Sequence, residues 1–419
     1  MTIEAVSIPT QRGRRRKNRL ADRPRTPIEL ELTGFAAGGR AVGRAPDGRV
    51  AFVEFAIPGE RVIAEITREE SSFVEASTVM VLEASPARVE PRCEYFGRCG
   101  GCQLQHINYR EQLALKTGLV REQLRRIGHF EDPPVLDAIG MDDPWGYRNH
   151  IRFTVRRDGQ VGFMQRGTHR FLRIDHCDIA HARVNEVLRQ VQERTMQTAQ
   201  LSVRVGENTG DVLVQPKLRW RPARGASVPS GQPHYTERLR GATYRVSSPA
   251  FFQVNTRQAE VLAGLVLRHV NEAHPRVAVD AYAGVGTFAA LLADHVEQVV
   301  TIEWSAAAGD DGEVNLRPYS NVTRVVGSVE DVLPGLDPAP DVVVVDPPRI
   351  GLQRSVVDTI LASPVRRLVY VSCDPSTLAR DLRLLVDGGF ALREVQPLDM
   401  FPHTQHIECV SVLDRLDEA

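Results

Sequence analysis

The segment that decides the fold runs Val277-Ala-Val-Asp280-Ala-Tyr-Ala-Gly284-Val-Gly286-Thr287, and Phe288-Ala-Ala-Leu-Leu292 follows it. The apolar run predicts a buried β-strand, the glycines predict a tight turn, and the residues after them predict a helix. Three more apolar runs end at Glu303, Asp346 and Ser372. Continuously apolar strands are typical of a parallel sheet covered on both faces. The C-terminal part of the chain is therefore predicted to be a doubly wound α/β domain with a Rossmann-like fold.

The glycine turn predicts a nucleoside-binding site. Gly284 and Gly286 let the backbone come close to a ligand, and Glu303 follows 17 residues after Gly286. A carboxylate at that place can accept hydrogen bonds from both ribose hydroxyls. The third glycine of the dinucleotide motif is absent, since Phe288 and Ala289 occupy that turn. The pattern favours S-adenosylmethionine over NAD, although a plain strand-to-helix turn has the same pattern.

Length and composition exclude several classes of protein. A chain of 419 residues has room for two or three domains, because one core rarely exceeds about 250–300 residues. Its 42% hydrophobic and 25% charged residues exclude collagen, wholesale disorder and a disulfide-dense small protein. No apolar run approaches the roughly 18 residues of a membrane helix, and charges interrupt the N-terminus from Arg12 onward. We expect a cytoplasmic protein without a membrane partner, and by default a monomer.

The charge distribution indicates a polyanionic partner. Residues 1–250 carry 39 Lys and Arg against 29 Asp and Glu, whereas residues 251–419 carry 13 against 24. Such an asymmetry indicates that the basic half meets a polyanion. Nearly all the cations are arginines, whose planar groups suit contact with RNA. A GC-rich genome also produces an arginine bias, but it does not explain the asymmetry.

The N-terminal half is predicted to contain two domains. Residues 1–25 are polar and basic, and we expect a disordered tail. Short apolar alternations, separated by glycine-rich turns that include the stretch 34–48, lie at 28–32, 50–53, 61–66 and 76–82. They favour an OB-like β-barrel over residues 26–84. Residues 85–245 are predicted to form a β-rich central domain with helices over 108–127 and near 182–197, which leaves 246–419 for the α/β domain.

Two motifs end predicted buried strands, at the sheet edge where α/β proteins bind ligands. In Asp346-Pro-Pro-Arg349 the prolines stiffen the loop, and Asp346 can accept a hydrogen bond from a planar base. In Ser372-Cys373-Asp374-Pro375 the cysteine can face a substrate, and its thiolate form is the nucleophile. A lone cysteine is otherwise a small buried hydrophobe, which is our interpretation of Cys409.

Glu408 is an acid within an apolar alternation, His406-Ile-Glu-Cys-Val410, that predicts a strand. An isolated buried carboxylate is costly, so a catalytic role would explain its presence. An edge strand with Glu408 facing solvent is the alternative, and the pattern does not decide between them.

A compact cysteine cluster predicts a metal site. Cys93, Cys99 and Cys102 lie close together, and Cys177 is a fourth candidate ligand. Disulfides are not expected in a cytosolic chain. Four thiolates suit zinc or an iron–sulfur cluster, and the three-plus-one spacing is more typical of iron–sulfur.

Taken together, these motifs resemble those of the TRAM-containing RNA uridine-C5 methyltransferases, from about residue 26 to the end of the chain. The resemblance implies a TRAM domain at the N-terminus and a [4Fe–4S] cluster on Cys93, Cys99, Cys102 and Cys177. It implies that Gln253, within Phe251-Phe-Gln-Val-Asn255, contacts S-adenosylmethionine. The other implied cofactor contacts are Tyr282, Gly284, Gly286, Glu303 and Asp346.

The resemblance also implies a mechanism. Cys373 would be the nucleophile that adds to C6 of uracil, Asp346 would hold the base, and Glu408 would remove the C5 proton. The expected substrate is a specific uridine in structured RNA, with rRNA favoured over tRNA. Two other readings stand beside it. One is an RNA or DNA amino-group methyltransferase, which needs no nucleophilic cysteine, and the other is a catalytically silent RNA-binding protein.

Overall fold

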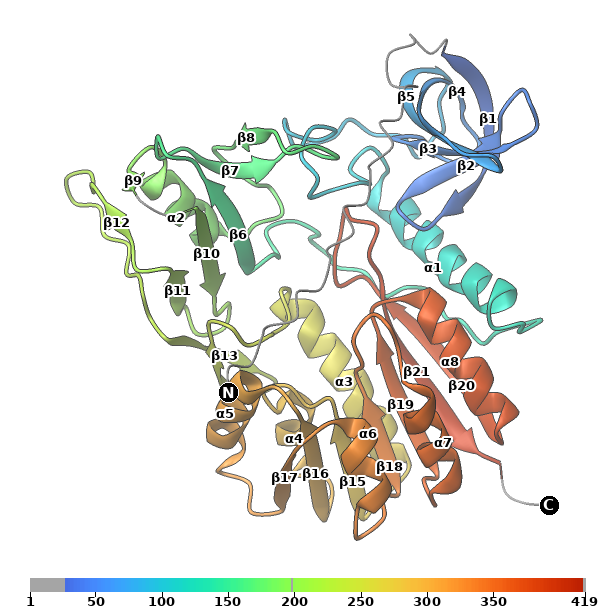
Figure 1. The fold of residues 1–419 in the computed structure, drawn as a ribbon, viewed down its shortest axis with the longest axis vertical. Helices are drawn as coiled ribbons and strands as arrows, with labels where there is room; N and C mark the ends of the chain where they lie inside the picture. The colour runs from blue at the N-terminus through green and yellow to red at the C-terminus, as the bar shows by residue number, and fades with distance from the viewer. Residues whose placement is uncertain (1–26, 197–198, 417–419) are drawn as a thin grey trace, which may run out of the picture.

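The structure is a computed structural model, and it describes residues 27–196 and 199–416. The tail predicted at 1–25 lies outside these residues. A barrel, a central β-rich region and a C-terminal α/β domain follow one another along the chain (Figure 1). Within the described ranges, no helix is both long enough and apolar enough to span a bilayer.

The first five strands close into a barrel in the order β1-β2-β3-β5-β4, as the sequence predicted for this region. They are β1 (Ile28–Ala36), β2 (Arg40–Arg44), β3 (Val50–Glu54), β4 (Arg61–Glu69) and β5 (Phe73–Glu83). Alternate side chains, among them Leu30 and Val62, fill the interior. Strand β2 lies in the stretch predicted only as turns. Gly38 and Gly39, with φ of 92° and 69°, reverse the chain so that β2 pairs with β1.

The segment after the barrel carries three of the clustered cysteines and leads into α1 (Tyr109–Arg126). The side chain of Asn108 caps this helix by accepting from the Glu111 amide at 2.9 Å. Val120 and Leu124 of α1 lie in the same core as residues of α8 (Pro375–Asp387). Helix α1 falls within the predicted central domain, yet it packs on the C-terminal sheet. The apolar face of a helix does not say which partner covers it, so sequence could not show this.

The central region is built on a five-stranded sheet in the order β11-β10-β6-β7-β8, with α2 against β10. The elements are β6 (His150–Val155), β7 (Val161–Met164), β8 (Phe171–Arg173), α2 (Ala182–Val191), β10 (Gln200–Val205) and β11 (Val212–Gln215). A small ribbon joins β9 (Thr195–Met196) to β12 (Arg219–Trp220). A hairpin of β13 (His234–Leu239) and β14 (Ala242–Ser247) then leads to the C-terminal domain.

The C-terminal domain is a seven-stranded sheet in the order β17-β16-β15-β18-β19-β21-β20, with helices on both faces. Its strands are β15 (Val277–Ala281), β16 (Gln298–Glu303), β17 (Val322–Val326), β18 (Val342–Val345), β19 (Arg367–Ser372), β20 (Phe390–Leu398) and β21 (Glu408–Arg415). Its helices are α3 (Thr256–Glu272), α4 (Thr287–Leu292), α5 (Ala306–Leu316), α6 (Val329–Val332), the 3₁₀ turn η1 (Leu333–Gly335), α7 (Arg354–Ala362) and α8.

The order of these strands places the site. The strands β15 to β19 are parallel, and the chain reverses its direction of winding between β15 and β18. A ligand crevice forms at such a switch point, beyond the carboxyl ends of the strands. Strand β21 lies antiparallel between β19 and β20. The predicted doubly wound sheet is therefore confirmed. Asp346 follows β18 at the switch point, Cys373 follows β19, and Glu408 begins β21.

Candidate active site

The turn after β15 forms one wall of a cavity of about 60 Å³. Tyr282, Gly284 and Gly286 have φ of 65°, 57° and 85°. A Cβ on Gly286 would lie 2.8 Å from Leu316 Cδ1, so that position requires glycine for two reasons. At Gly284 the space that a Cβ would fill is open. The predicted contact residues that line this cavity are Gln253, Tyr282, Gly284 and Asp346.

Glu303 is the last residue of β16, and its carboxylate accepts a hydrogen bond from the turn that follows β15. Its Oε2 accepts from the Gly284 amide at 2.8 Å, and its Oε1 accepts from the Ser305 amide at 2.6 Å. A narrow groove beside the cavity is lined by Gly284, Gly286, Glu303 and Gly312, among others. Each carboxylate oxygen retains a free lone pair, so Glu303 can still accept hydrogen bonds from a ligand in this groove.

Asp280 is a buried acid that the sequence analysis quoted but did not assign. Its Oδ2 accepts from the Ala289 amide at 2.9 Å, and its Oδ1 has no partner in the described structure. Burial, together with the charges of Asp346 and Glu303, raises the pKa of Asp280 to about 7. The sequence did contain a signal for Asp280, because an acid within an apolar strand is the same pattern that marked Glu408 as a candidate.

Cys373 and Glu408 face each other across two paired strands. Ser372, the last residue of β19, pairs with Cys409 of β21 in antiparallel register, so Cys373, the first residue after the strand, lies opposite Glu408. Cys373 is partly buried, and Glu408 is only 4% exposed. Since β21 is an interior strand, the solvent-facing alternative for Glu408 is wrong. Cys409 is fully buried in the core, as predicted.

The electrostatics of this site bring three acidic groups together. Burial, followed by the charges of Glu408 and Asp346, raises the pKa of the Cys373 thiol to about 11. Burial raises the pKa of Asp346 to about 7. Burial and the charge of Asp346 raise the pKa of Glu408 well above its ordinary range. The site therefore disfavours negative charge on all three groups at once, and at least one of them keeps its proton at neutral pH.

Arg349 offsets part of this charge. Its guanidinium lowers the pKa of Cys373 and of Glu408. Arg349 Nη2 also lies 3.4 Å from His406 Nδ1. The sequence pattern assigns no role to His406, since a histidine two residues before a strand gives no signal of its partner.

The four clustered cysteines line a separate cavity of about 390 Å³. No disulfide joins any of the six cysteines, all of which the structure describes. Burial raises the pKa of Cys93 to about 11, with Asp178 adding to the effect, and raises that of Cys177 to about 12. The pKa of Cys99 and of Cys102 is raised for the same main reason. Among described residues, no group of three or more His, Cys, Asp or Glu side chains is arranged to hold a metal ion.

The cysteine segment is hydrogen-bonded to the loop that precedes Glu408. The backbone amides of Gln103 and Leu104 both donate to the His403 carbonyl at 3.0 Å. The Gln405 amide donates to Gln103 Oε1 at 3.2 Å. In Figure 1 the loop between β20 and β21 rises from the C-terminal sheet toward this segment. The two thiol sites are thus linked through one short loop.

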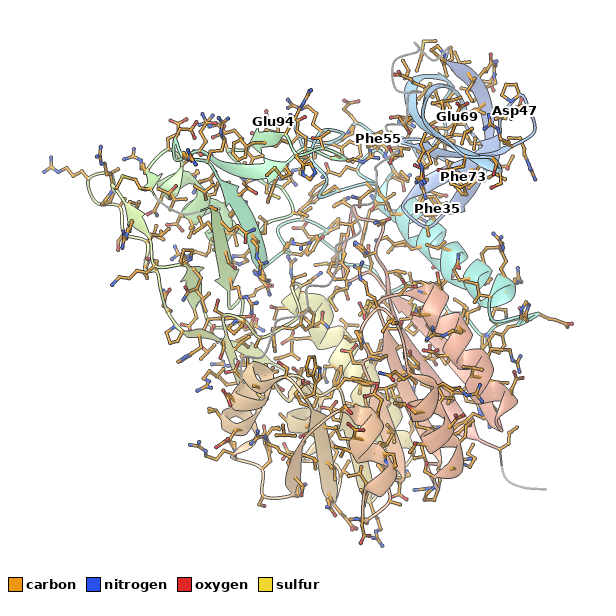
Figure 2. All side chains as sticks on the ribbon, viewed as in Figure 1. Phe35, Asp47, Phe55, Glu69, Phe73 and Glu94 are labelled. Carbon is orange, nitrogen blue, oxygen red and sulfur yellow. The ribbon has the colours of Figure 1, made fainter. Side chains whose placement is uncertain are left out.

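The same segment contacts the barrel and the central sheet. Phe55 lies at the edge of the barrel that faces the cysteine segment (Figure 2), and its ring packs edge-to-face on Phe96 with centroids 5.4 Å apart. The guanidinium of Arg166, which follows β7, lies 4.8 Å from the centroid of Phe55. Three parts of the molecule therefore meet at the cysteine segment.

Comparison with known proteins agrees with this geometry. A family model described as tRNA (Uracil-5-)-methyltransferase matches residues 337–416, which include the ends of β18, β19 and β21. An uncharacterized RNA methyltransferase of Gloeobacter violaceus is 35% identical over 93% of this chain and 96% of its own length. One of Halalkalibacterium halodurans is 34% identical over 92% of this chain and 96% of its own. The chain belongs to the RNA uracil-5-methyltransferase family.

A solved structure extends the likeness to the whole fold of this RNA uracil-5-methyltransferase. The tRNA (uracil-54, C5)-methyltransferase of Pyrococcus abyssi, solved with S-adenosyl-L-homocysteine, superposes with a TM-score of 0.71 at 26% identity. The match covers 92% of this chain and 99% of that chain. The fold is that of a class I S-adenosylmethionine-dependent methyltransferase with a small closed β-barrel. The predicted family and enzyme class are confirmed.

Proposed function

We propose that this enzyme transfers a methyl group from S-adenosylmethionine to C5 of a uridine in RNA, with Cys373 as the nucleophile. The observation that carries the proposal is the register of β19 and β21, which sets the Cys373 thiol opposite the buried Glu408. Amino-group methylation needs no nucleophilic thiol, so it would give this thiol–carboxyl pair no role in the reaction. The residues predicted to hold the cofactor line the adjoining cavity and groove.

Two features of this region suit the cofactor. The backbone at Gly284 faces open space, and Glu303 lines the small pocket next to the cavity. Gln253, Tyr282 and Asp346 would complete its contacts. When bound, S-adenosylmethionine supplies an electrophilic methyl group on a sulfonium.

The protein side of the reaction follows from the geometry. The Cys373 thiolate would add to C6 of uracil, which moves an electron pair onto C5 and O4 as an enolate. Arg349 favours the thiolate through its positive charge. Asp346 would accept from uracil N3–H and fix the ring. After C5 has taken the methyl group, Glu408 would remove the C5 proton, and the electron pair would re-form the C5–C6 bond and expel Cys373.

We propose that the second cavity holds a [4Fe–4S] cluster on Cys93, Cys99, Cys102 and Cys177. All four thiols line one cavity of about 390 Å³, and four cysteine thiolates are the usual ligand set of such a cluster. The positive charge of the irons would hold the four buried thiols as thiolates. The cluster would tie residues 93–102 to Cys177 and fix the loop at His403.

The RNA-binding surface is proposed from charge and architecture. The barrel, which we propose to be a TRAM domain, and the arginine-rich central region would contact phosphates, so binding would weaken with salt. The target base must leave its stack to reach Cys373, which costs a few kcal/mol and favours loop uridines. We propose rRNA ahead of tRNA as the substrate.

The test is mass-spectrometric mapping of 5-methyluridine in rRNA and tRNA from a deletion strain and its parent. The proposal predicts loss of the modification at a defined uridine, and its return with the wild-type gene but not with Cys373→Ala. Loss in tRNA alone would overturn the rRNA assignment. An unchanged pattern in both RNAs would contradict the proposed reaction.

A further inference from the structure

Arg349 needs a partner to stay at the site. Its side chain is exposed, and a free arginine side chain carries about 2 kcal/mol of rotamer entropy. Its backbone is anchored, since its carbonyl accepts from Thr377 Oγ1 of α8 at 3.1 Å. That bond fixes the start of the side chain but not the guanidinium. A contact at the far end of the side chain decides how long the charge stays beside Cys373.

His406 makes that contact. The ring nitrogen Nδ1 lies 3.4 Å from Arg349 Nη2. Because a guanidinium only donates hydrogen bonds, Nδ1 must be the acceptor, and the proton of the neutral imidazole lies on Nε2. The ring is itself held, with Phe401 edge-to-face at 5.7 Å and the His406 amide donating to Thr404 Oγ1 at 3.3 Å.

The surroundings keep His406 neutral. Burial lowers its pKa to about 4, and the positive charges of Arg349, Lys116 and Arg148 act in the same direction. Asp374 acts in the opposite direction. At neutral pH the Nδ1 lone pair is therefore available to the guanidinium.

We propose that His406 is a positioning residue that holds the guanidinium of Arg349 against the thiol of Cys373. This inference rests on the proposed function, in which that thiol is the nucleophile. Without the acceptor at Nδ1, the guanidinium would turn toward solvent. Cys373 would keep its burial and the charges of Glu408 and Asp346 but lose the cation that offsets them, so less thiolate would form at a given pH.

The test measures the thiolate without RNA. The full-length purified protein, with its metal content retained, is alkylated with iodoacetamide across a pH series, and the Cys373 peptide is followed by mass spectrometry. His406→Ala should slow alkylation of Cys373 roughly 3–10-fold at pH 8, the effect of losing one half-exposed charge contact. His406→Asn places a carbonyl oxygen near the position of Nδ1 and should stay within about two-fold of wild type. His406→Gln places it near Nε2 and should behave like alanine.

Two further readouts separate the outcomes. The melting temperature of each variant identifies loss of folding, and a fall in kcat at unchanged KM for S-adenosylmethionine identifies a loss confined to the thiol. Equal alkylation profiles for wild type, His406→Ala and His406→Gln would overturn the positioning role. Absence of uridine methylation by the wild-type protein would instead overturn the proposed function, and the alkylation profiles would still report on Arg349.

Discussion

The chain holds two sets of buried thiols in different electrostatic surroundings. At the strand ends, Cys373 lies opposite Glu408, and the charge of Arg349 lowers the pKa of its thiol. In the other cavity, Cys102 and Cys177 lie near further thiols, whose charges raise their pKa beyond the effect of burial. Burial acts alike on both sets. The neighbours therefore decide the chemistry.

This difference separates a nucleophile from a ligand set. A thiol with one adjacent guanidinium can form a thiolate when a substrate arrives, and it is released at the end of the reaction. Four thiols whose pKa burial raises this far would remain protonated at neutral pH, and a metal centre would stabilise them together as thiolates. The loop at 399–407 joins the two sites, so the cluster cysteines can fix the position of the site at Cys373 and Glu408.

The largest expected effect comes from removing the reactive thiol. Cys373→Ala should reduce methylation on the order of 10⁴–10⁶-fold, the range seen when a catalytic nucleophile is removed, while RNA affinity stays within a few-fold. Single-turnover methylation and filter binding measure the two quantities. Cys409→Ala, which removes the adjacent core thiol, is the matched control and should retain activity. A variant at Cys373 with wild-type turnover would abolish the distinction between the two sets.

Glu408→Gln keeps the size of the side chain and removes the base. Methyl transfer should still occur, but release should slow roughly 10²–10⁴-fold, the usual contribution of a general base. A methylated protein–RNA adduct should therefore accumulate on denaturing gels. Rapid turnover without adduct would show that another group takes the C5 proton.

Cys102→Ser tests the four cysteines that are proposed to bind the iron–sulfur cluster. We expect most of the iron to be lost and activity to fall on the order of 10–100-fold, because misplacing a reactive group by about 1 Å has effects of that size. Iron content per chain, visible absorbance and kcat measure the outcome. Cys409→Ala should keep the iron. Full activity in an iron-free Cys102→Ser protein would show that the loop at His403 needs no support from the cluster.

The smallest effect concerns Asp280, which is buried near the strand-end site. Its pKa is raised from 3.8 to about 7, so the folded state holds a proton that the unfolded state has lost between these values. Stability should therefore fall as pH rises from about 4 to 7, by at most on the order of 4 kcal/mol. The gap in unfolding free energy between wild type and Asp280→Asn, followed against pH, measures this. Glu297→Gln, at an exposed ion pair, should show no such trend.

The sequence predicted which strands carry the site better than it predicted which strands lie next to one another in the sheet. Apolar runs ending in Glu303, Asp346 and Ser372 located the strands, since parallel strands buried on both faces are continuously apolar. The burial of Glu408 could not be decided, because it depends on β21 lying between β19 and β20. Strand order is a long-range property that the alternation of one strand does not contain.

The contacts that the sequence did not predict are also long-range. His406 meets Arg349 across 57 residues of chain, and Gln103 meets Gln405 across 302. The cysteine spacing predicted that four thiols would gather, which the structure bears out. It could not predict that their segment also forms hydrogen bonds to the loop before Glu408. One acceptor in these bonds is the backbone carbonyl of His403, and every residue has such a carbonyl.

The most direct test of the central claim uses RNA in which uridine is replaced by 5-fluorouridine. Fluorine at C5 cannot leave as a proton, so Glu408 has nothing to remove and the adduct cannot resolve. With S-adenosylmethionine present, the account predicts a denaturation-resistant protein–RNA complex in which the peptide containing Cys373 carries a 5-methylated, 5-fluorinated nucleotide. An adduct on another cysteine, or methylated RNA released without any adduct, would contradict it.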